Sequence, residues 1–300
     1  MSMRVKELLN IAETQMSESG VENPDVDSKL LYCYLRRIPK AKLILEYQVS
    51  LEDYLCEEYF SLLDKRCAGI PLQYIIGRQG FMGFSFIVNE DVLIPRPDTE
   101  ILVDNAVKVI NENKIGDEQL PERGKGSFDV LDLGCGSGAI GVSIAKLCKT
   151  TKVTCSDISP EAVAVARKNA ELNSVKIAFE EGDLFEPFKK ARFRKKRFDM
   201  IISNPPYVRT GEIPYLQREI KDHEPLIALD GGDDGLKLYK RIIRQAPEFL
   251  KKDGILMFEI GAEQKDAVVE MLEKNGHYQD LHSLQDLAHF DRVVFARIKD

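Results

Sequence analysis

The sequence predicts an α/β fold with a doubly wound, mostly parallel sheet, preceded by a small bundle of helices. Three observations support this prediction. From residue 128 onward, short apolar runs alternate with helical segments, and such βαβ alternation is typical of parallel sheets. A glycine-rich turn separates the first of these runs from the next helix. Residues 1–75, in contrast, repeat apolar side chains at the helical period.

Residues 1–75 are predicted to form the helical domain, because three apolar faces recur there at helical spacing. Asn23 and Pro24 supply an N-cap and a first-turn proline for the second helix. The three predicted faces consist of Val5, Leu8, Leu9 and Ala12, then of Val26, Leu30, Cys33 and Tyr34, and then of Leu51, Leu55, Tyr59, Leu62 and Leu63.

Residues 76–98 are predicted to be a β-hairpin linker between the two domains. Apolar runs at 81–87 and 92–94 flank the polar residues 89–91, so we expect the hairpin turn at those polar residues. Two prolines then end the extended segment, and a helix is expected from about Thr99.

Residues 99–300 are predicted to form the sheet domain. Its polar stretch at 111–127 is expected to be a surface loop. Strands are predicted at 128–132, 152–156, 175–179, 198–203, 254–260 and 292–297, with helices from about 139, at 160–173 and at 264–274.

Length and composition fit a globular protein with one large and one small domain. The chain has 300 residues, of which 44% are hydrophobic and 30% charged. Its net charge of −7 argues against a general nucleic-acid binder. One local exception is the basic stretch from Lys189 to Arg197, which places seven basic residues among nine. This stretch is either a solvated loop or a contact for RNA or an acidic partner.

The cysteines and histidines suggest neither disulfides nor a metal site. The six cysteines contain no Cys-x-x-Cys pair, and the four histidines form no triad or metal motif. Reduced thiols are therefore expected. No apolar stretch reaches membrane-spanning length, and the N-terminus does not resemble a signal peptide. We expect a cytoplasmic protein that binds no membrane.

The first chemical motif is the glycine turn that follows the predicted strand at 128–132. Glycines at this place let the backbone approach a ligand and expose amide donors at a helix N-terminus. Residues 136–141 also fit the Gly-x-Gly-x-x-Gly pattern of dinucleotide-binding proteins, and a tight turn without a ligand is the alternative. The turn consists of Gly134, Cys135, Gly136, Ser137 and Gly138, preceded by Asp132.

Two acidic positions follow the next two predicted strands. Asp157 can accept both ribose hydroxyls of an adenosine-containing cofactor. Its alternative role is a helix N-cap, although Ser159 is better placed for that. Asp183 can accept from an adenine amine with Leu184 against the ring, and a solvated acidic turn is the alternative.

Asn204, Pro205, Pro206 and Tyr207 follow the fourth predicted strand. The Asn204 amide oxygen and the Pro205 carbonyl are two acceptors for the hydrogens of a planar NH₂ group, and Tyr207 offers an aromatic face. All four motifs follow strand ends at the edge where α/β sheets bind ligands. The sequence therefore predicts one crevice in which a weak nitrogen nucleophile meets a cofactor.

These motifs together resemble the HemK-type (PrmC) protein-glutamine N5-methyltransferases, a family that modifies class 1 peptide chain release factors. Met82 and Leu184 stand where the family usually has aromatics, and the basic stretch is unusual for it. The matching segments are residues 71–77 (Pro-Leu-Gln-Tyr-Ile-Ile-Gly), residues 93–100 (Leu-Ile-Pro-Arg-Pro-Asp-Thr-Glu), residues 132–138, residues 204–207, Glu224 with Pro225, residues 228–236 and residues 291–294.

The resemblance implies a seven-stranded, Rossmann-like sheet that binds S-adenosylmethionine and leaves S-adenosylhomocysteine as product. It places Gly134 to Gly138 beside the methionine moiety, Asp157 on the ribose, and Asp183 with Leu184 near the adenine. Asn204 would lie between cofactor and substrate. The implied substrate is the glutamine of the release factor's Gly-Gly-Gln motif, with the helical domain gripping that protein.

Three other functions stay open at this point. An N6-adenine or guanine-N2 nucleic-acid methyltransferase would use the same Asn204 motif, and its support is the basic stretch. A nicotinamide oxidoreductase rests on residues 136–141 alone and leaves Asn204 without a role. A non-catalytic adaptor would use only the helical domain.

Overall fold

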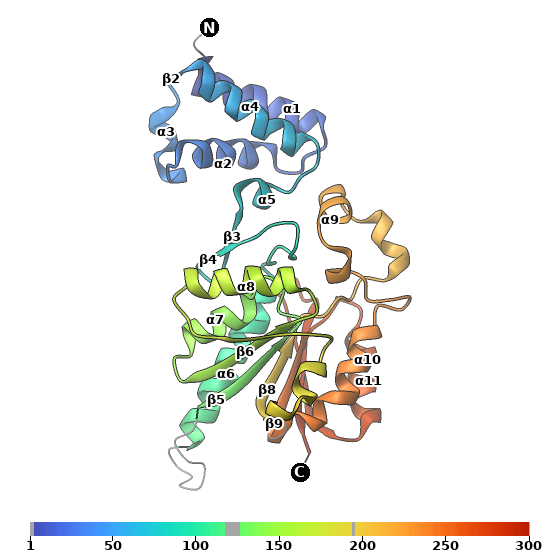
Figure 1. The fold of residues 1–300 in the computed structure, drawn as a ribbon. Helices are drawn as coiled ribbons and strands as arrows, with labels where there is room; N and C mark the ends of the chain where they lie inside the picture. The colour runs from blue at the N-terminus through green and yellow to red at the C-terminus, as the bar shows by residue number, and fades with distance from the viewer. Residues whose placement is uncertain (1–2, 118–126, 194–195, 300) are drawn as a thin grey trace. The chain divides into compact units, whose positions relative to one another are not determined.

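The computed structural model describes residues 3–117, 127–193 and 196–299 (Figure 1). They form two compact units. The helical unit combines Met1–Arg78 with Leu216–His223, and the sheet unit combines Gln79–Tyr215 with Glu224–Asp300. The helical unit thus contains a short segment that the sequence prediction assigned to the sheet domain.

The helical unit consists mainly of amphipathic helices, as its apolar periodicity predicts. Its first predicted face is confirmed, because Val5, Leu8, Leu9 and Ala12 are all buried. A short antiparallel pair joins the start of the chain to the segment before α4. The elements are β1 (Met3–Arg4), α1 (Val5–Glu18), α2 (Pro24–Arg36), α3 (Leu43–Glu46), β2 (Ser50–Leu51), α4 (Asp53–Cys67), α5 (Leu72–Ile76) and α9 (Arg218–His223).

The predicted apolar face of α2 is wrong in part. Val26 and Tyr34 are 38% and 44% exposed, whereas Leu31 and the charged Asp27 are buried. Asp27 turns inward because its Oδ2 accepts from Nε of the buried Arg66 at 2.7 Å. An ion pair therefore rotates the helix away from the face that hydrophobicity alone predicts.

Arg66 also joins the two sequence segments of the helical unit. Its Nη2 lies 2.8 Å from Oε2 of Glu219 on α9, in addition to the contact with Asp27 on α2. The Arg66 side chain is 7% exposed, so both carboxylates neutralise a charge that is largely removed from water. This arrangement anchors α9 to α4.

The predicted hairpin exists, but its expected turn at residues 89–91 is wrong. Strand β3 (Arg78–Phe81) joins β4 (Phe84–Ile87) through Met82 and Gly83, whose φ angles are 52° and 74°. Two positive φ angles match the right-handed twist of a two-residue hairpin. Met82 tolerates this conformation while its N–H donates to Glu100 Oε1 at 2.6 Å, a long-range contact that no local pattern reveals.

The predicted doubly wound, mostly parallel sheet is confirmed. The strand order is β10-β11-β9-β8-β5-β6-β7, with parallel pairing from β9 to β7 and antiparallel pairing of β11 with both neighbours. The strands are β5 (Phe128–Leu133), β6 (Thr151–Asp157), β7 (Ala178–Glu181), β8 (Phe198–Ser203), β9 (Leu250–Glu259), β10 (Tyr278–Gln285) and β11 (Asp291–Ile298).

Several elements differ from the sequence prediction, and helix α10 (Lys237–Gln245) and the start of β9 at Leu250 are among them. Strand β10 is absent from the predicted strands, since as an edge strand it carries polar residues on much of its length. Strand β7 begins at Ala178 rather than at residue 175. Helix α6 (Thr99–Asp117) extends into the predicted loop at 111–127, of which residues 118–126 lie outside the described part of the chain.

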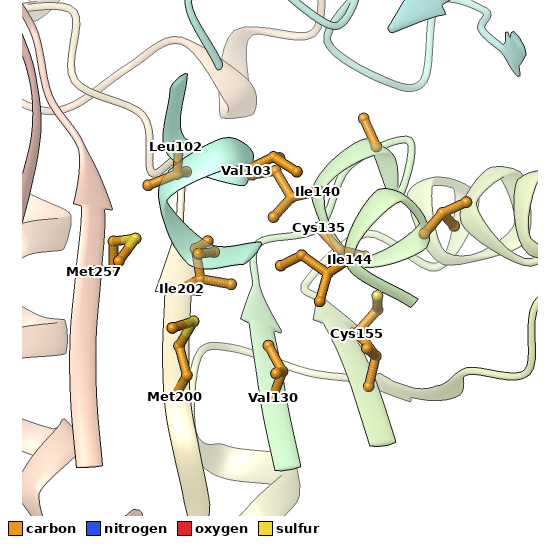
Figure 2. Close-up of a cluster of buried hydrophobic side chains, with 14 of the residues drawn as sticks. Leu102, Val103, Val130, Cys135, Ile140, Ile144, Cys155, Met200, Ile202 and Met257 are labelled. Carbon is orange, nitrogen blue, oxygen red and sulfur yellow. The ribbon is translucent and has the colours of Figure 1, made fainter. Parts of the chain in front are cut away.

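Helices cover both faces of the sheet (Figure 1). Helices α6, α7 (Ala139–Leu147) and α8 (Pro160–Leu172) pack on one face, and α10 (Lys237–Gln245) and α11 (Lys265–Asn275) on the other. Alternate residues of β8 enter the two cores, because successive side chains of a strand point to opposite faces. Figure 2 shows part of the core between the sheet and helices α6, α7 and α8. In this core, Val130, Met200, Ile202 and Met257 of the sheet face Leu102, Val103, Ile140 and Ile144 of the helices. None of the helices in the described ranges is long and apolar enough to span a bilayer.

Candidate active site

A cavity of about 640 Å³ lies in the sheet unit, at the carboxyl ends of its parallel strands. The motifs that follow four consecutive strands of the chain line it, as expected for a doubly wound sheet. Its walls include Gly134, Cys135, Gly136 and Ser137 after β5, Asp157 at the end of β6, Asp183 and Leu184 after β7, and Asn204, Pro205 and Pro206 after β8.

The glycine turn presents open backbone to this cavity. Gly134 and Gly136 adopt φ angles of 73° and 51°, and a Cβ atom added to either would meet no atom within 4 Å. Gly138 has a different reason to be glycine, because an added Cβ would lie 3.0 Å from Ala166 Cβ of α8. Gly138 is the N-cap residue of α7 and does not line the cavity. Gly134 and Gly136 are therefore the glycines of the turn whose backbone borders the cavity.

A buried carboxyl group supports the turn from behind. Asp132 is fully buried, and its Oδ2 accepts from the Gly141 N–H at 2.9 Å. Burial raises the pKa of this carboxyl to about 7. A Cβ on Gly141 would lie 2.4 Å from Cys155 Sγ, so close packing of α7 against β6 accounts for the last glycine of the dinucleotide-like pattern.

Asp157 links the glycine turn to the end of β6. Its Oδ2 accepts from the Gly136 N–H at 2.8 Å, and its Oδ1 accepts from the Ser159 N–H at 3.0 Å. The N-cap of α8 is Ser159, whose hydroxyl accepts from the Ala162 N–H at 3.0 Å. Burial raises the pKa of Asp157, and the backbone donors partly offset this effect. The carboxylate is thus fixed at the cavity wall with lone pairs left over for a ligand.

Asp183 has a partner that the sequence did not suggest. Its Oδ2 lies 2.6 Å from Nη2 of Arg241 on α10, and both residues line the cavity. Leu184 adopts a left-handed φ of 48°, which is uncommon for a branched side chain and fixes the course of the chain here. A ligand amine at Asp183 would share that carboxylate with Arg241.

Asn204 is held by two neighbours that the sequence analysis did not select. Its Nδ2 lies 3.4 Å from Oγ1 of Thr99, which begins α6. Glu259, at the end of β9, accepts hydrogen bonds from both Thr99 and Asn204. Glu259 is 2% exposed, and burial raises its pKa to about 7. The sequence signal that could have indicated Glu259 is its position as the single acid within the apolar run at 254–260.

Tyr207 is not among the residues that line the cavity. It packs against the core between the sheet and helices α10 and α11, and its backbone oxygen accepts from Gln264 Nε2 at 3.0 Å. Burial raises the pKa of its phenol to about 12. The cavity wall as described contains Asn204, Pro205 and Pro206 but not Tyr207. The stacking of its ring on a substrate stays a prediction.

Two further sequence motifs meet at the cavity. Arg96, from the Pro-Arg-Pro segment, forms an ion pair with Glu224, whose side chain is 1% exposed. Leu226 and Ile227 follow Glu224 and line the cavity while 59% and 58% exposed. One rim of the cavity is thus apolar and accessible.

Three basic residues of the stretch from Lys189 to Arg197 form local contacts. Lys189 pairs with Glu186 at 2.7 Å, Arg192 pairs with Glu180, and Lys196 Nζ donates to Thr154 Oγ1 at 2.9 Å. Residues 194–195 lie outside the described part of the chain. These contacts favour a folded, solvated surface segment.

Comparison with known proteins supports the assignment suggested by this geometry. The Methyltransferase small domain family matches residues 117–221, and the PrmC N-terminal domain family matches residues 7–77. The release factor glutamine methyltransferase of Clostridium acetobutylicum is 38% identical over 296 residues, which cover 98% of each chain. Its namesake from Geobacter sulfurreducens is 36% identical over 294 residues, which cover 98% of this chain and 96% of that protein. The crystal structure of the hMettl16 catalytic domain in complex with the MAT2A 3′UTR hairpin 6 has a TM-score of 0.52 at 14% identity, covers 83% of each chain and is similar in fold.

The fold, the cavity and these matches define an S-adenosylmethionine-dependent methyltransferase. More narrowly, the chain belongs to the release factor glutamine methyltransferase family, since the two relatives exceed 30% identity over nearly the whole chain. The resemblance seen in the sequence motifs is therefore confirmed, and so is the implied seven-stranded sheet.

Proposed function

We propose that this protein methylates the side-chain amide nitrogen of the glutamine in the Gly-Gly-Gln motif of class 1 release factors. The observation that carries the proposal is the amide of Asn204 at the cavity wall, anchored through its nitrogen by Thr99 and Glu259. An amide held in this way leaves its oxygen as an acceptor for a substrate NH₂ group. The names of the full-length relatives support the release factor as substrate.

The cavity suits S-adenosylmethionine. Gly134 and Gly136 present open backbone, and the fixed carboxylate of Asp157 can accept both ribose hydroxyls. When bound, S-adenosylmethionine supplies a methyl carbon that accepts the amide's electron pair as its bond to the sulfonium sulfur breaks. The residues proposed to hold it are Gly134, Cys135, Gly136, Ser137 and Gly138 around the methionine moiety, Asp157 at the ribose, Asp183 and Leu184 at the adenine, and Asn204 next to the methyl group.

Asn204 and Pro205 are the proposed catalytic residues. A glutamine amide is a poor nucleophile, because its nitrogen lone pair is delocalised into the carbonyl. The Asn204 Oδ1 and the Pro205 carbonyl would accept its two N–H hydrogens and aim that lone pair at the methyl carbon. Such positioning supplies up to about 7–11 kcal/mol in well-oriented reactions. The methylated nitrogen then releases one proton, and Pro206 and Tyr207 complete the substrate contacts.

The helical unit is proposed to bind the release factor. Residues 1–75 form its main part, and residues 76–98 are the proposed linker. The PrmC N-terminal domain match over residues 7–77 supports a dedicated role for this unit. Since release factors act in translation, the proposed place of action is the cytoplasm.

A nucleic-acid methyltransferase is the second candidate, because an adenine or guanine amine could also occupy the Asn204 acceptors. The basic stretch from Lys189 to Arg197 is the observation that favours it, and RNA contact there stays a prediction. Lys189, Arg192 and Lys196 of this stretch already have local partners in Glu186, Glu180 and Thr154, which weakens this candidate.

The test is a labelled-methyl transfer assay with four acceptors. We expect label on purified class 1 release factor, and none on release factor whose Gly-Gly-Gln glutamine is replaced by alanine. We also expect no label on duplex DNA or ribosomal RNA. Label on nucleic acid alone would support the second candidate and remove the first.

A further inference from the structure

We propose that Glu259 is a positioning residue of the methyl transfer, which holds the Asn204 amide with its oxygen toward the cavity and polarises that oxygen. The inference rests on the proposed function, because it assigns the Asn204 oxygen to a substrate amide. Glu259 comes from β9 and Asn204 from the end of β8, so the two neighbouring strands build one acceptor between them.

The strand register brings the two side chains together. In the parallel pair of β8 and β9, Ser203 lies opposite Phe258. Asn204 and Glu259 are therefore the next residues along the two strands, at the edge of the sheet that borders the cavity. Thr99 approaches the same point from the first turn of α6.

The hydrogen bonds around Glu259 select one orientation of the Asn204 amide. Thr99 Oγ1 and the Glu259 carboxylate are acceptors for the two Nδ2 hydrogens, and the Thr99 hydroxyl donates to Glu259 in turn. A flipped amide would place its oxygen against the carboxylate and leave that carboxylate with one donor fewer. Buried acceptors without donors cost about 1–3 kcal/mol, so the orientation with Oδ1 toward the cavity is favoured.

The remaining carboxylate oxygen points to a role beyond packing. Within the described residues, Oε2 of Glu259 has no hydrogen-bond partner although the side chain is only 2% exposed. A buried carboxylate destabilises the fold at this place more than a glutamine would, because a neutral amide is easier to bury. During the reaction, positive charge develops on the substrate nitrogen, and the negative charge of Glu259 would stabilise it. A carboxylate behind the Asn204 amide strengthens the negative end of that dipole.

The protonation state of Glu259 controls this arrangement. The charged and titratable groups near it are Asp98, which raises its pKa, Arg292, which lowers it, and the phenols of Tyr207 and Tyr239. Arg292 is shared, because it pairs with Asp98 at 3.1 Å and with Asp286 at 2.8 Å. Burial is the largest effect and places the pKa of Glu259 near 7. A protonated Glu259 loses an acceptor and gains a donor, which favours the flipped Asn204 amide and should slow methyl transfer.

The test compares wild type with Glu259→Gln and with the control Tyr278→Phe. The control removes a buried hydrogen bond from Tyr278 to the Ile243 carbonyl, and neither of these two residues lines the cavity. Purified release factor is the substrate at saturating S-adenosylmethionine. We expect the wild-type kcat to rise with pH through about 7, and Glu259→Gln to lose about tenfold or more in kcat at about pH 8 together with that pH dependence. KM and S-adenosylmethionine affinity should change by less than about threefold, and the control should keep both kcat and pH dependence.

A second readout does not depend on the reaction. In wild type with ¹⁵N-labelled asparagine, the Asn204 side-chain amide resonance should shift with a midpoint near pH 7, and in Glu259→Gln it should not. An amide that does not titrate in wild type, or a Glu259→Gln enzyme with wild-type kcat, overturns the inference. If Glu259→Gln does not fold, Thr99 offers a second test. Thr99→Val should lower kcat about tenfold, and Thr99→Ser should keep kcat near the wild-type value. Equal kcat in the two Thr99 variants overturns the inference. A wild-type enzyme that methylates no release factor overturns the proposed function instead, and the titration then decides the placement of Glu259 by itself.

Discussion

The backbone N–H of Gly136 donates to Oδ2 of Asp157 at 2.8 Å. This hydrogen bond joins the glycine turn after β5 to the end of β6, the two places from which the cofactor is proposed to be held. The carboxylate is therefore oriented before any ligand arrives, which lowers the entropy lost on binding.

Replacing Asp157 with Asn should weaken cofactor binding. An asparagine keeps one acceptor oxygen, which cannot serve Gly136, Ser159 and two ribose hydroxyls together. Hydrogen bonds to charged groups contribute about 1.5–3 kcal/mol, so S-adenosylmethionine affinity should fall about 10–100-fold. Isothermal titration calorimetry measures this loss, with the exposed Asp280→Asn as control. Equal affinity in Asp157→Asn and wild type would remove the ribose role.

Two glycines of the same motif should respond differently to alanine. In Gly136→Ala the new methyl group meets open space beside the cavity, so affinity for S-adenosylmethionine should fall while stability drops by only about 1 kcal/mol. In Gly141→Ala the methyl group overlaps Cys155 Sγ, and the free energy of unfolding should fall by about 1–3 kcal/mol or more. Urea denaturation and calorimetry separate the two effects. The reverse ranking of the two variants in stability would contradict this packing.

Asp132→Asn should change how stability depends on pH. Because the pKa of Asp132 is raised to about 7, its protonated form stabilises the fold below about pH 4, and this stabilisation is lost as the pH rises through 7. Asparagine cannot ionise and should not show this loss. Between about pH 4 and pH 8 the unfolding free energy should therefore shift in favour of the variant by about 3–4 kcal/mol. Urea denaturation at several pH values measures the difference, and a difference independent of pH would show that Asp132 is ionised throughout.

Arg66→Ala should destabilise the helical unit. It leaves Asp27 and Glu219 without their common cation, and loss of one partner from a buried ion pair costs about 3–5 kcal/mol. Arg218→Ala is the matched control, since its pair with Asp222 is exposed and should contribute less than about 1 kcal/mol. Far-UV circular dichroism during urea denaturation compares the two. Similar losses in both variants would mean that the Arg66 pairs contribute no more than a surface pair.

The sheet and the cavity motifs were predictable because their signals are local. Strands β5 and β8 are buried on both faces and appear in the sequence as short apolar runs with glycine or proline directly after them. Parallel strands bring those following residues to one edge, so the sequence alone assigns Asp157 and Asn204 to the same crevice.

The features that were missed depend on contacts between distant segments. The face of α2 follows from the Asp27–Arg66 pair, 39 positions apart, and the Asn204–Thr99 contact joins residues 105 positions apart. Arg241 meets Asp183 from a helix 58 positions later. No periodicity or turn pattern encodes such pairs, and a single sequence carries no other record of them.

The most direct test of the central claim locates the methyl group on the product. Release factor incubated with S-adenosylmethionine and either wild type or Asn204→Ala is digested and sequenced by tandem mass spectrometry, while calorimetry checks that both enzymes bind S-adenosylmethionine. We expect wild type to add one methyl group to the glutamine of the Gly-Gly-Gln peptide, and Asn204→Ala to add none detectable while keeping most of its cofactor affinity. Substantial methylation of that glutamine by Asn204→Ala, or methyl groups only at other residues with wild type, would contradict the account.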